Sequence, residues 1–480
     1  MQVKAERDLG MVAFFSVHQA GGNYLGCGQM DKNVFQRMLS FFYGLDLVNT
    51  NLKSKFDTTM KISGLAIDIC RSWDRLRQDL YTYLNGQGLC NYAPYTELIR
   101  PWTSVAYLVQ GTTMSEVANE YLTPLGLTSI SPVATSSVLN NKNLYPYYLR
   151  TVPPDSLQAE AMTEILQLFK WDYFTAVYSD VGYGQMGMKN IKEILEKKKA
   201  GCLTESLKMS LDADLNEAIK IVKRLDSYKY VRVVILFTFT SHTRLILEAA
   251  HQLQLVGRFT WIGGDDWANR ESVTKGLEDV ARGAITIQLR SEPVPGFRKW
   301  VKELTLTNRK GIPDDWFEEY WQHTHKCRLT NSIVRQTQYA RQCDQDEKIV
   351  ENQVMDDPVI LHNIIATYVT AWGLSSTTTC KGEGIDDCLW RLKKDRKHQL
   401  IYDAIRAAQW KVLEDELGDN SFQFKFTEQG FGDIGYSILN YRLKGASTTE
   451  YGYKRVSAVS IETEMILFQS GTLSAELSIF

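Results

Sequence analysis

The segment Tyr173-Phe-Thr-Ala-Val-Tyr178 is followed, after three further residues, by Gly182-Tyr-Gly-Gln-Met-Gly187. A short aromatic and β-branched run is typical of a buried parallel strand, and the glycines after it favour a turn into a helix. Four further apolar runs have the same character: Met11–Val17, Val105–Val109, Val231–Phe239 and Phe259–Ile262. Amphipathic stretches with helical spacing lie between such runs, for example residues 34–45 and 159–169. This alternation predicts an α/β fold with parallel sheets and right-handed crossovers.

Length and charge set the limits of the interpretation. A chain of 480 residues exceeds one hydrophobic core, so two or three domains are expected. The composition is 44% hydrophobic and 23% charged, as in ordinary globular proteins and unlike disordered chains. Because 54 basic residues balance 56 acidic ones and form no basic stripe, we expect no nucleic-acid partner.

The C-terminal part of the chain has a different order of elements. Residues 314–324 and 359–374 are predicted to form helices, and the tail from Phe422 onward is predicted to form strands. No apolar run approaches the roughly 18 residues that a membrane span needs. Charged residues at positions 4–8 interrupt the N-terminus before any long apolar core. We therefore expect either a cytosolic protein or a mature or trimmed fragment.

The eight cysteines include no CxxC pair and are too few for a disulfide scaffold in so long a chain. Three local pairings are nevertheless expected to be disulfides: Cys27–Cys90, Cys327–Cys343 and Cys380–Cys388. Cys70 is expected to be unpaired. His323 and Cys327 share a helix face, but their spacing is not a usual zinc pattern, and a disulfide would remove the Cys327 thiolate. We therefore expect no metal site and no cofactor.

The glycines at 182–187 also match the GxGxxG pattern of dinucleotide-binding proteins. Glu205 lies about twenty residues further on, where an acid that binds a ribose would stand. Against this interpretation, three residues separate the strand from the first glycine, and Asp180 would bring negative charge close to a pyrophosphate. The pattern leaves a nicotinamide-dependent dehydrogenase as the enzyme alternative. A lone GxGxxG is weak support for it.

Three other loops follow predicted strands, at the place where open α/β sheets bind ligands. Gly111-Thr-Thr113 offers hydroxyls and a helix N-terminus to a carboxylate, although threonine also caps helices routinely. Val133-Ala-Thr-Ser136 offers a further hydroxyl and backbone groups. In Gly263-Gly-Asp-Asp-Trp267, Asp265 would either pair with a ligand ammonium or cap the next helix.

Taken together, these segments resemble the ligand-binding domain of metabotropic glutamate receptors, which belong to the class C G-protein-coupled receptors. The stretches that carry the resemblance occur in the family's order across nearly the whole chain, and several are long and idiosyncratic. They are the following: Arg150-Thr-Val-Pro-Pro-Asp155, Gln158-Ala-Glu-Ala-Met162, Tyr183-Gly-Gln-Met-Gly187, Ile262-Gly-Gly-Asp-Asp-Trp-Ala268, Gly283-Ala-Ile-Thr-Ile287 and Trp316-Phe-Glu-Glu-Tyr-Trp-Gln-His323.

The resemblance implies a bilobed Venus flytrap of the periplasmic-binding-protein type I fold. Lobe 1 is expected to hold residues 1–149 and 290–441, and lobe 2 residues 150–289 and 442–480. Lobe 1 would anchor the ligand and form a homodimer, and lobe 2 would close. The family's cysteine-rich and seven-helix portions have no counterpart in the sequence, which implies an ectodomain fragment from the extracellular face of the cell membrane. The signal would pass to a G protein through a membrane domain absent from this chain, and no enzyme activity is implied.

The resemblance also assigns a binding site. Its expected residues are Arg37, Thr112, Thr113, Val133, Ala134, Thr135, Asp155, Tyr183, Asp265 and Arg270. Thr112 would hold the α-carboxylate of an amino acid, and Thr135 would contact the amino-acid backbone. Asp265 would be the chief partner of the α-ammonium group, with Asp155 and Tyr183 beside it.

The side-chain end of the expected site departs from the family's pattern. Asn33 stands where the family has a tyrosine, and Val359 stands near where it has a lysine. Arg37 matches the arginine that grips the side-chain carboxylate of glutamate, and Arg270 matches one that faces the same end. Two arginines still favour a carboxylate, so L-glutamate is the first choice of ligand and another L-α-amino acid the alternative. A soluble carrier or decoy of the same fold is a further alternative. Cys202 resembles the position that bridges to the cysteine-rich domain, so it should be free here.

Overall fold

The protein is described by a computed structural model, and its chain divides into two compact units, neither of which is a continuous segment. Unit 1 comprises Met1–Ala134, Leu139–Val152 and Ser291–Gly432. Unit 2 comprises Thr135–Val138, Pro153–Arg290 and Asp433–Phe480. The structure describes the following residues: 9–21, 26–56, 61–87, 92–95, 99, 101, 103–180, 182–198, 201–310, 312–330, 332, 339–344, 346–375, 385–445, 450–459 and 466–468.

Unit 1 is built on a six-stranded sheet with the strand order β5-β4-β1-β6-β7-β8. Its strands are β1 Leu9–Phe15, β4 Ile62–Asp68, β5 Tyr92–Tyr95, β6 Ser104–Val109, β7 Ser129–Ser131 and β8 Tyr148–Arg150. Neighbouring strands are parallel except for β4 and β5. Every residue of β1 is buried, as expected for a strand that is covered on both faces.

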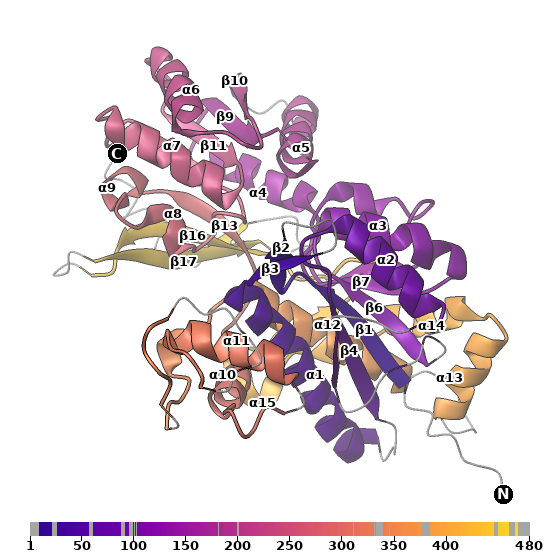
Figure 1. Cartoon of the computed structure of the whole chain (residues 1–480). Coiled ribbons are helices and arrows are strands. Elements are labelled where there is room, and N and C mark those ends of the chain that lie inside the picture. Colours follow the sequence, from indigo (N-terminus) through magenta and orange to yellow (C-terminus); the bar gives the residue numbers. More distant parts are fainter. Residues whose placement is uncertain are drawn as a thin grey trace, which may run out of the picture. The chain divides into compact units, whose positions relative to one another are not determined.

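Helices cover both faces of this sheet (Figure 1). The main ones are α1 Lys32–Phe56, α2 Trp73–Leu84, α3 Thr112–Leu122 and α12 Pro358–Ser375. On one face α2 and α3 pack together, and Leu76, Leu80 and Val117 join the core with residues of β1, β4 and β6. On the other face α1 packs against α12. There Gly64 of β4 lies so close to α1 that a Cβ would stand 2.2 Å from Leu45 Cδ1.

Shorter elements complete unit 1 and the connection that it shares with unit 2. They are β2 His18–Ala20, β3 Cys27–Met30, η1 Thr123–Leu125, η2 Ser137–Asn140, α10 Pro295–Lys302, α11 Asp314–His325, η3 Glu351–Gln353, α13 Ile385–Lys394, α14 His398–Arg406, β14 Gln409–Lys411, α15 Glu414–Leu417, η5 Gly418–Asn420 and β15 Gln423–Lys425. The strands β2 and β3 form an antiparallel hairpin, and β14 pairs antiparallel with β15.

Unit 2 is built on an eight-stranded sheet with the order β10-β9-β11-β12-β13-β16-β17-β18. Its strands are β9 Tyr173–Ser179, β10 Cys202–Met209, β11 Val233–Phe237, β12 Thr260–Gly263, β13 Ile285–Leu289, β16 Tyr436–Leu443, β17 Tyr451–Val459 and β18 Ile466–Phe468. The first five strands in that order are parallel, and the last three are antiparallel. Its helices are α4 Asp155–Leu168, α5 Gly182–Lys198, α6 Leu215–Ser227, α7 Thr240–Gln252, α8 Glu271–Thr274 and α9 Glu278–Ala281. Among them, α4 packs on α5 and α6 packs on α7.

The α/β class predicted from the sequence is confirmed. The five apolar runs correspond to β1, β6, β9, β11 and β12, and the predicted helices lie in α1, α4, α11 and α12. Within the described residues, no helix has both the length and the apolar character needed to cross a membrane.

The last change of unit along the chain lies earlier than expected. The prediction kept the segment up to residue 441 with lobe 1, whereas unit 2 already begins again at Asp433. The reason is strand β16, which pairs antiparallel with β13 from Leu289↔Tyr436 to Ile285↔Asn440. An edge added by a distant segment leaves no local signal in the sequence.

One predicted disulfide is wrong and another is confirmed. Cys27 is bonded to Cys70, which was expected to be unpaired, and not to Cys90, which lies outside the described residues. The β2–β3 hairpin brings Cys27 next to the end of β4, with a Cα–Cα distance of 5.3 Å, within the range of about 4.4 to 6.8 Å that a disulfide needs. Sequence spacing alone cannot fix such a connectivity.

The other cysteines agree with the prediction where the structure describes them. Cys327 is bonded to Cys343. Cys388 is also in a disulfide, and its predicted partner Cys380 lies outside the described residues. Cys202 is an exposed free thiol.

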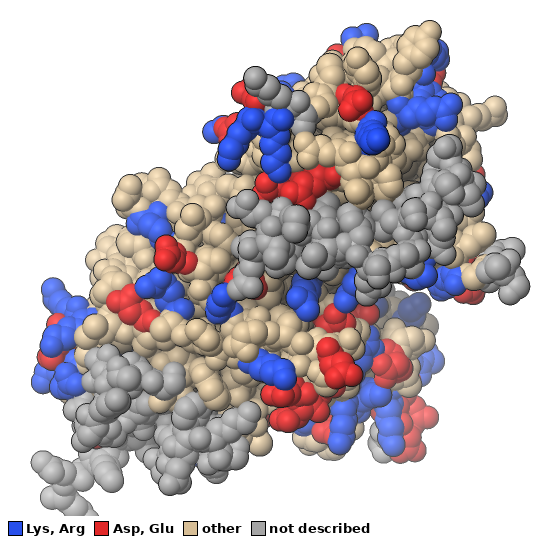
Figure 2. All heavy atoms as spheres, turned by 180° about the vertical axis from the view of Figure 1, so that it is seen from behind, with Lys and Arg blue, Asp and Glu red and all other residues tan. Residues whose placement is uncertain are grey.

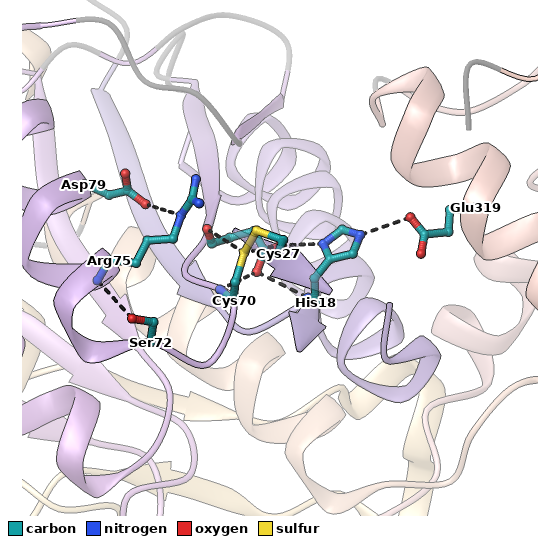
Figure 3. The surroundings of a disulfide bond; sticks show 8 residues. His18, Cys27, Cys70, Ser72, Arg75, Asp79 and Glu319 are labelled. Atoms are coloured by element: carbon teal, nitrogen blue, oxygen red, sulfur yellow. Dashed lines mark hydrogen bonds and ion pairs between the residues drawn. A yellow bond between two sulfur atoms is a disulfide. The ribbon is translucent and has the colours of Figure 1, made fainter. Parts of the chain in front are cut away.

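Beside the corrected disulfide, the imidazole of His18 lies between two carboxylates (Figure 3). Its Nδ1 is 2.5 Å from Asp68 Oδ2, and its Nε2 is 3.1 Å from Glu319 Oε2 on α11. Glu319 also accepts from the backbone amide of Met30 at 3.1 Å. Burial alone would lower the pKa of His18, but the hydrogen bonds and charges of Asp68 and Glu319 outweigh it and raise this pKa to about 9. A protonated His18 therefore ties the hairpin to β4 and α11.

We expect a His18→Gln variant to lose a pH-dependent part of the stability. Because the pKa of His18 in the folded protein is about 9 and its ordinary value is 6.5, the contribution is complete below pH 6.5 and is lost as the pH rises through about 9. Within that window, each pH unit should lower the unfolding free energy of the unmodified protein by roughly 1.4 kcal/mol relative to the variant. Urea unfolding of both proteins across the window measures this difference.

Two buried lysines make the comparison with the variant necessary. Burial lowers the pKa of Lys142 to about 8 and that of Lys393 to about 7. These groups favour the neutral form in the folded protein, so they add stability as the pH rises, opposite to His18. Parallel stability curves for the two proteins would contradict a charged His18.

Candidate functional site

Four polar side chains of unit 2 are connected by hydrogen bonds. The hydroxyl of Tyr183 on α5 donates to Asp265 Oδ1 at 2.7 Å. The Oε1 of Gln158 on α4 accepts from the backbone amide of Asp265 at 2.9 Å, and its Nε2 donates to Asp155 Oδ1 at 3.4 Å. Because α5 follows β9 and Asp265 follows β12, the cluster lies at the carboxyl ends of parallel strands.

A glycine allows the loop after β12 to reach this cluster. A Cβ at position 264 would lie 2.6 Å from Gln158 Oε1 and 2.8 Å from the Tyr183 hydroxyl. A larger residue there would displace the ends of these two side chains. Gly264 therefore allows the close approach on which the hydrogen bonds of the cluster depend.

The charges of the cluster suit an ammonium group. Burial raises the pKa of Asp265, and the hydrogen bond from Tyr183 partly offsets that rise. Burial and the neighbouring acids raise the pKa of Tyr183 well above its ordinary value, so its hydroxyl stays a donor at neutral pH. Asp155 is completely buried on the same cluster. A partly buried carboxylate that is held by a fixed donor is a strong partner for a cation.

Two more expected residues join this cluster through the backbone. Thr135 is buried, and its carbonyl accepts from the amide of Asp155 at 2.8 Å. Arg270 donates to the carbonyl of Asp265 at 2.8 Å and to that of Asp266. The structure thus brings together Thr135, Asp155, Tyr183, Asp265 and Arg270, although Arg270 turns back on its own loop.

In unit 1, the N-terminus of α3 is open. Its N-cap is Gly111, which has a φ of 87° and no side chain to cap the helix, and a Cβ there would meet nothing within 4 Å. Thr112 is half-buried and Thr113 is exposed. Within the described residues, neither threonine hydroxyl makes a hydrogen bond, so the capping interpretation of these threonines is not supported. Hydroxyls and backbone amides at a helix N-terminus suit an anion such as a carboxylate.

The turn after β7 is held by a serine. Ser131 Oγ accepts from the backbone amides of Val133 and Ala134 at 3.4 and 3.1 Å. The guanidinium of Arg150 donates to the carbonyl of Ala134 at 3.1 Å. Val133 is half-buried and Ala134 is buried. Their side chains are apolar, so this turn would contact a ligand mainly through a fixed apolar surface.

Arg37 already has a carboxylate partner within unit 1. Its Nε and Nη2 lie 3.0 and 2.5 Å from Asp357 Oδ2. Val359, which stands near the position of the family's lysine, is buried in the first turn of α12. Asp357 was not among the predicted site residues, although an acid directly before Pro358 is a signal for the start of a helix. Gln158, which lies one helical turn after Asp155, was not among them either.

The GxGxxG glycines are explained by packing. A Cβ at Gly184 would lie 2.2 Å from the carbonyl oxygen of Ser179, and one at Gly187 would lie 2.2 Å from the ring of Phe237. Both glycines let α5 pack closely on β9 and β11. Gly182 is exposed, and a Cβ there would meet nothing within 4 Å. The pattern therefore needs no phosphate to account for it.

Two groups of potential metal ligands occur among the described residues, and both contain a disulfide. They are Cys27, Asp68 and Cys70, and Cys327, Cys343 and Glu347. Bonded sulfur atoms cannot act as thiolate ligands. His323, considered with Cys327 above, has its Nδ1 3.0 Å from the hydroxyl of Tyr339.

The charged side chains on one face of the molecule are seen in Figure 2. On the face drawn in Figure 2, the basic and acidic side chains of the described residues are interspersed. The described residues of this face therefore form no large patch of one sign.

The chain matches a family described as the receptor family ligand binding region, over residues 90–444. It is similar to metabotropic glutamate receptor 6 of Oryctolagus cuniculus, with 28% identity across 95% of this chain and 53% of the relative. The metabotropic glutamate receptor of Drosophila melanogaster is 26% identical across 98% of this chain and 53% of the relative. Metabotropic glutamate receptor 4 of Mus musculus is 26% identical across 74% of this chain and 39% of the relative. The chain spans about half the length of the first two relatives.

Two alanine substitutions test the packing role of the glycines. Gly184→Ala should lower the free energy of unfolding by about 2 kcal/mol or more, because the new Cβ collides with backbone. Gly182→Ala should change it by less than about 0.5 kcal/mol, because the position is exposed and open. Urea unfolding measures both. Equal effects at the two positions would contradict the packing explanation.

Proposed function

The chain belongs to the receptor family of ligand-binding regions, and on that premise we propose that it is the extracellular ligand-binding domain of a class C receptor that binds a free L-α-amino acid. Its relatives are named as receptors and not as enzymes. Because the chain covers about half of the first two relatives, a membrane domain, a G protein and a homodimer through unit 1 are part of the proposal.

The observation that carries the proposal is the acidic cluster of unit 2. Asp265 is fixed by the Tyr183 hydroxyl at 2.7 Å and by Gln158 at its backbone amide, and Asp155 lies on the same network. A cation at Asp265 would regain the interaction energy that partial burial costs the carboxylate. The α-ammonium of an amino acid is a cation of suitable size.

The opposite end of an amino acid finds its complement in unit 1. At the start of α3, the hydroxyls of Thr112 and Thr113 and the first backbone amides are available to an α-carboxylate. Val133 and Ala134 would contribute a fixed wall beside the ligand. Unit 1 thus offers groups that suit a carboxylate, and unit 2 offers groups that suit an ammonium.

We propose that the ligand favours closure of the domain. A ligand that is held by both units has more contacts when they come together than when they are apart, so it shifts the population toward the closed arrangement. We propose that this shift is the signal, and that unit 2 is the moving part. A dehydrogenase would instead need a phosphate site at the glycines of the GxGxxG pattern. Close packing already explains why Gly184 and Gly187 are glycines.

Asp265→Asn should weaken binding strongly while leaving the fold intact. Removing one partner of a desolvated charge pair costs about 2–5 kcal/mol, which corresponds to a loss of affinity of about thirtyfold or more. A thermal-shift screen of the twenty amino acids on the unmodified protein identifies the probe, and calorimetry with that amino acid then compares the proteins.

A matched control removes an acid elsewhere in unit 2. Asp180 is bound to Gln185 and Lys208, and among the described residues no hydrogen bond or ion pair joins its side chain to the cluster, so Asp180→Asn should keep the affinity. If Asp265→Asn binds the amino acid as tightly as the control, the ammonium site lies elsewhere. If none of the twenty amino acids binds, the proposed ligand class is wrong.

A further inference from the structure

The guanidinium of Arg37 is engaged by a carboxylate of its own unit. Both Nε and Nη2 donate to Asp357 Oδ2, at 3.0 and 2.5 Å. The side chains are 23% and 11% exposed, so water screens the pair only in part. A charge-assisted pair of this kind is among the stronger polar interactions in a protein.

The pair is fixed from both sides by backbone contacts. Asp357 directly precedes Pro358, the first residue of α12, and its Oδ1 accepts from the amide of Val359 at 2.8 Å. On α1, the carbonyl of Arg37 accepts from Asn363 Nδ2 at 2.9 Å. The hydrogen bond from Val359 restrains the side chain of Asp357, and the one from Asn363 holds the backbone of Arg37 where α1 packs along α12.

The surroundings of the pair contain further acids. A small hollow beside it is lined by Glu292, Asp356, Asp357 and Arg298. Arg298 is itself bound to Glu351 at 2.7 Å and lies 3.8 Å from Asp356. A free positive charge for a ligand carboxylate is therefore not offered by Arg37 or by Arg298.

We propose that the ligand has an uncharged side chain, and that Asp357 sets this preference by neutralising Arg37. The inference rests on the proposed function and places Arg37 at the side-chain end of the bound amino acid. Asn363, which donates to the Arg37 carbonyl, accepts from Gln110, the residue before Gly111 at the start of α3. An acidic side chain would bring a second carboxylate close to Asp357, and like charges at short range oppose each other. A basic side chain would meet the guanidinium of Arg37 in the same way. The ion pair thus disfavours both classes of charged ligand and replaces glutamate as first choice with a neutral amino acid.

The test is a gain of acidic-ligand binding in Asp357→Asn. Asparagine caps helices as well as aspartate does, so the start of α12 is kept while the charge is removed. Calorimetry of the unmodified protein should show that the best neutral amino acid binds at least tenfold more tightly than L-glutamate. In Asp357→Asn, the ratio of glutamate to neutral affinity should rise at least tenfold, because Arg37 becomes available to a ligand carboxylate.

Asp356→Asn is the matched control. It removes the same charge from the neighbouring residue, whose side chain is 63% exposed and approaches Arg298 rather than Arg37. The ratio should stay within about threefold of that of the unmodified protein, because a mostly exposed charge is largely screened. An equal gain in both variants would show that general charge, and not the pair with Arg37, sets the preference, and would overturn the proposal. Asp357→Ser, which also caps a helix, replaces Asp357→Asn if the latter fails to fold.

Two results separate this inference from the proposed function. Tighter binding of glutamate than of every neutral amino acid by the unmodified protein would overturn the inference and leave the amino-acid receptor intact. Binding of none of the twenty amino acids would overturn both. Preference for a neutral amino acid, together with the gain in Asp357→Asn alone, supports both.

Discussion

Parallel pairing around β11 is the constraint on which the candidate site depends. The strands β9 and β12 are hydrogen-bonded to opposite sides of β11, so the loops that follow them leave the same end of the sheet. Tyr183 and Asp265, separated by 82 positions in the sequence, thereby come within 2.7 Å of each other. Gly264 and Gly184 then remove the side chains that would keep these elements apart. Strand order and close packing thus position the loops, and the polar side chains on these loops form the site.

Much of this frame could be predicted from local patterns. Buried strands such as β9 and β11 are visible as short apolar runs, and the loops after them as glycines and acids. The resemblance to a known family supplied Asp155, Tyr183 and Asp265, and the structure links these three through Gln158. Whether they bind an amino acid is a proposal, which the structure supports by their geometry and charge.

What could not be predicted depends on segments that are distant in the sequence. The Cys27–Cys70 disulfide exists because a hairpin folds beside the end of β4, and cysteine spacing contains no record of that proximity. The pair of Arg37 and Asp357 joins positions separated by 320 residues. Arg37 could be picked out from the sequence, but its ion pair with Asp357 could not. The partner of Arg37 thus determines whether its charge is available to a ligand.

The late return of the chain to unit 2 also bears on how fragments of this protein behave. β16 covers the side of β13 that β12 leaves open, and β17 covers β16 in turn. A chain shortened before Asp433 would leave β13 as a bare edge with unpaired backbone amides and carbonyls, which is a template for intermolecular sheet formation. Ile438 and Tyr441, both buried, would also be missing from the unit. Recombinant forms of the second unit therefore need residues from both sides of the long unit 1 segment if they are to avoid aggregation.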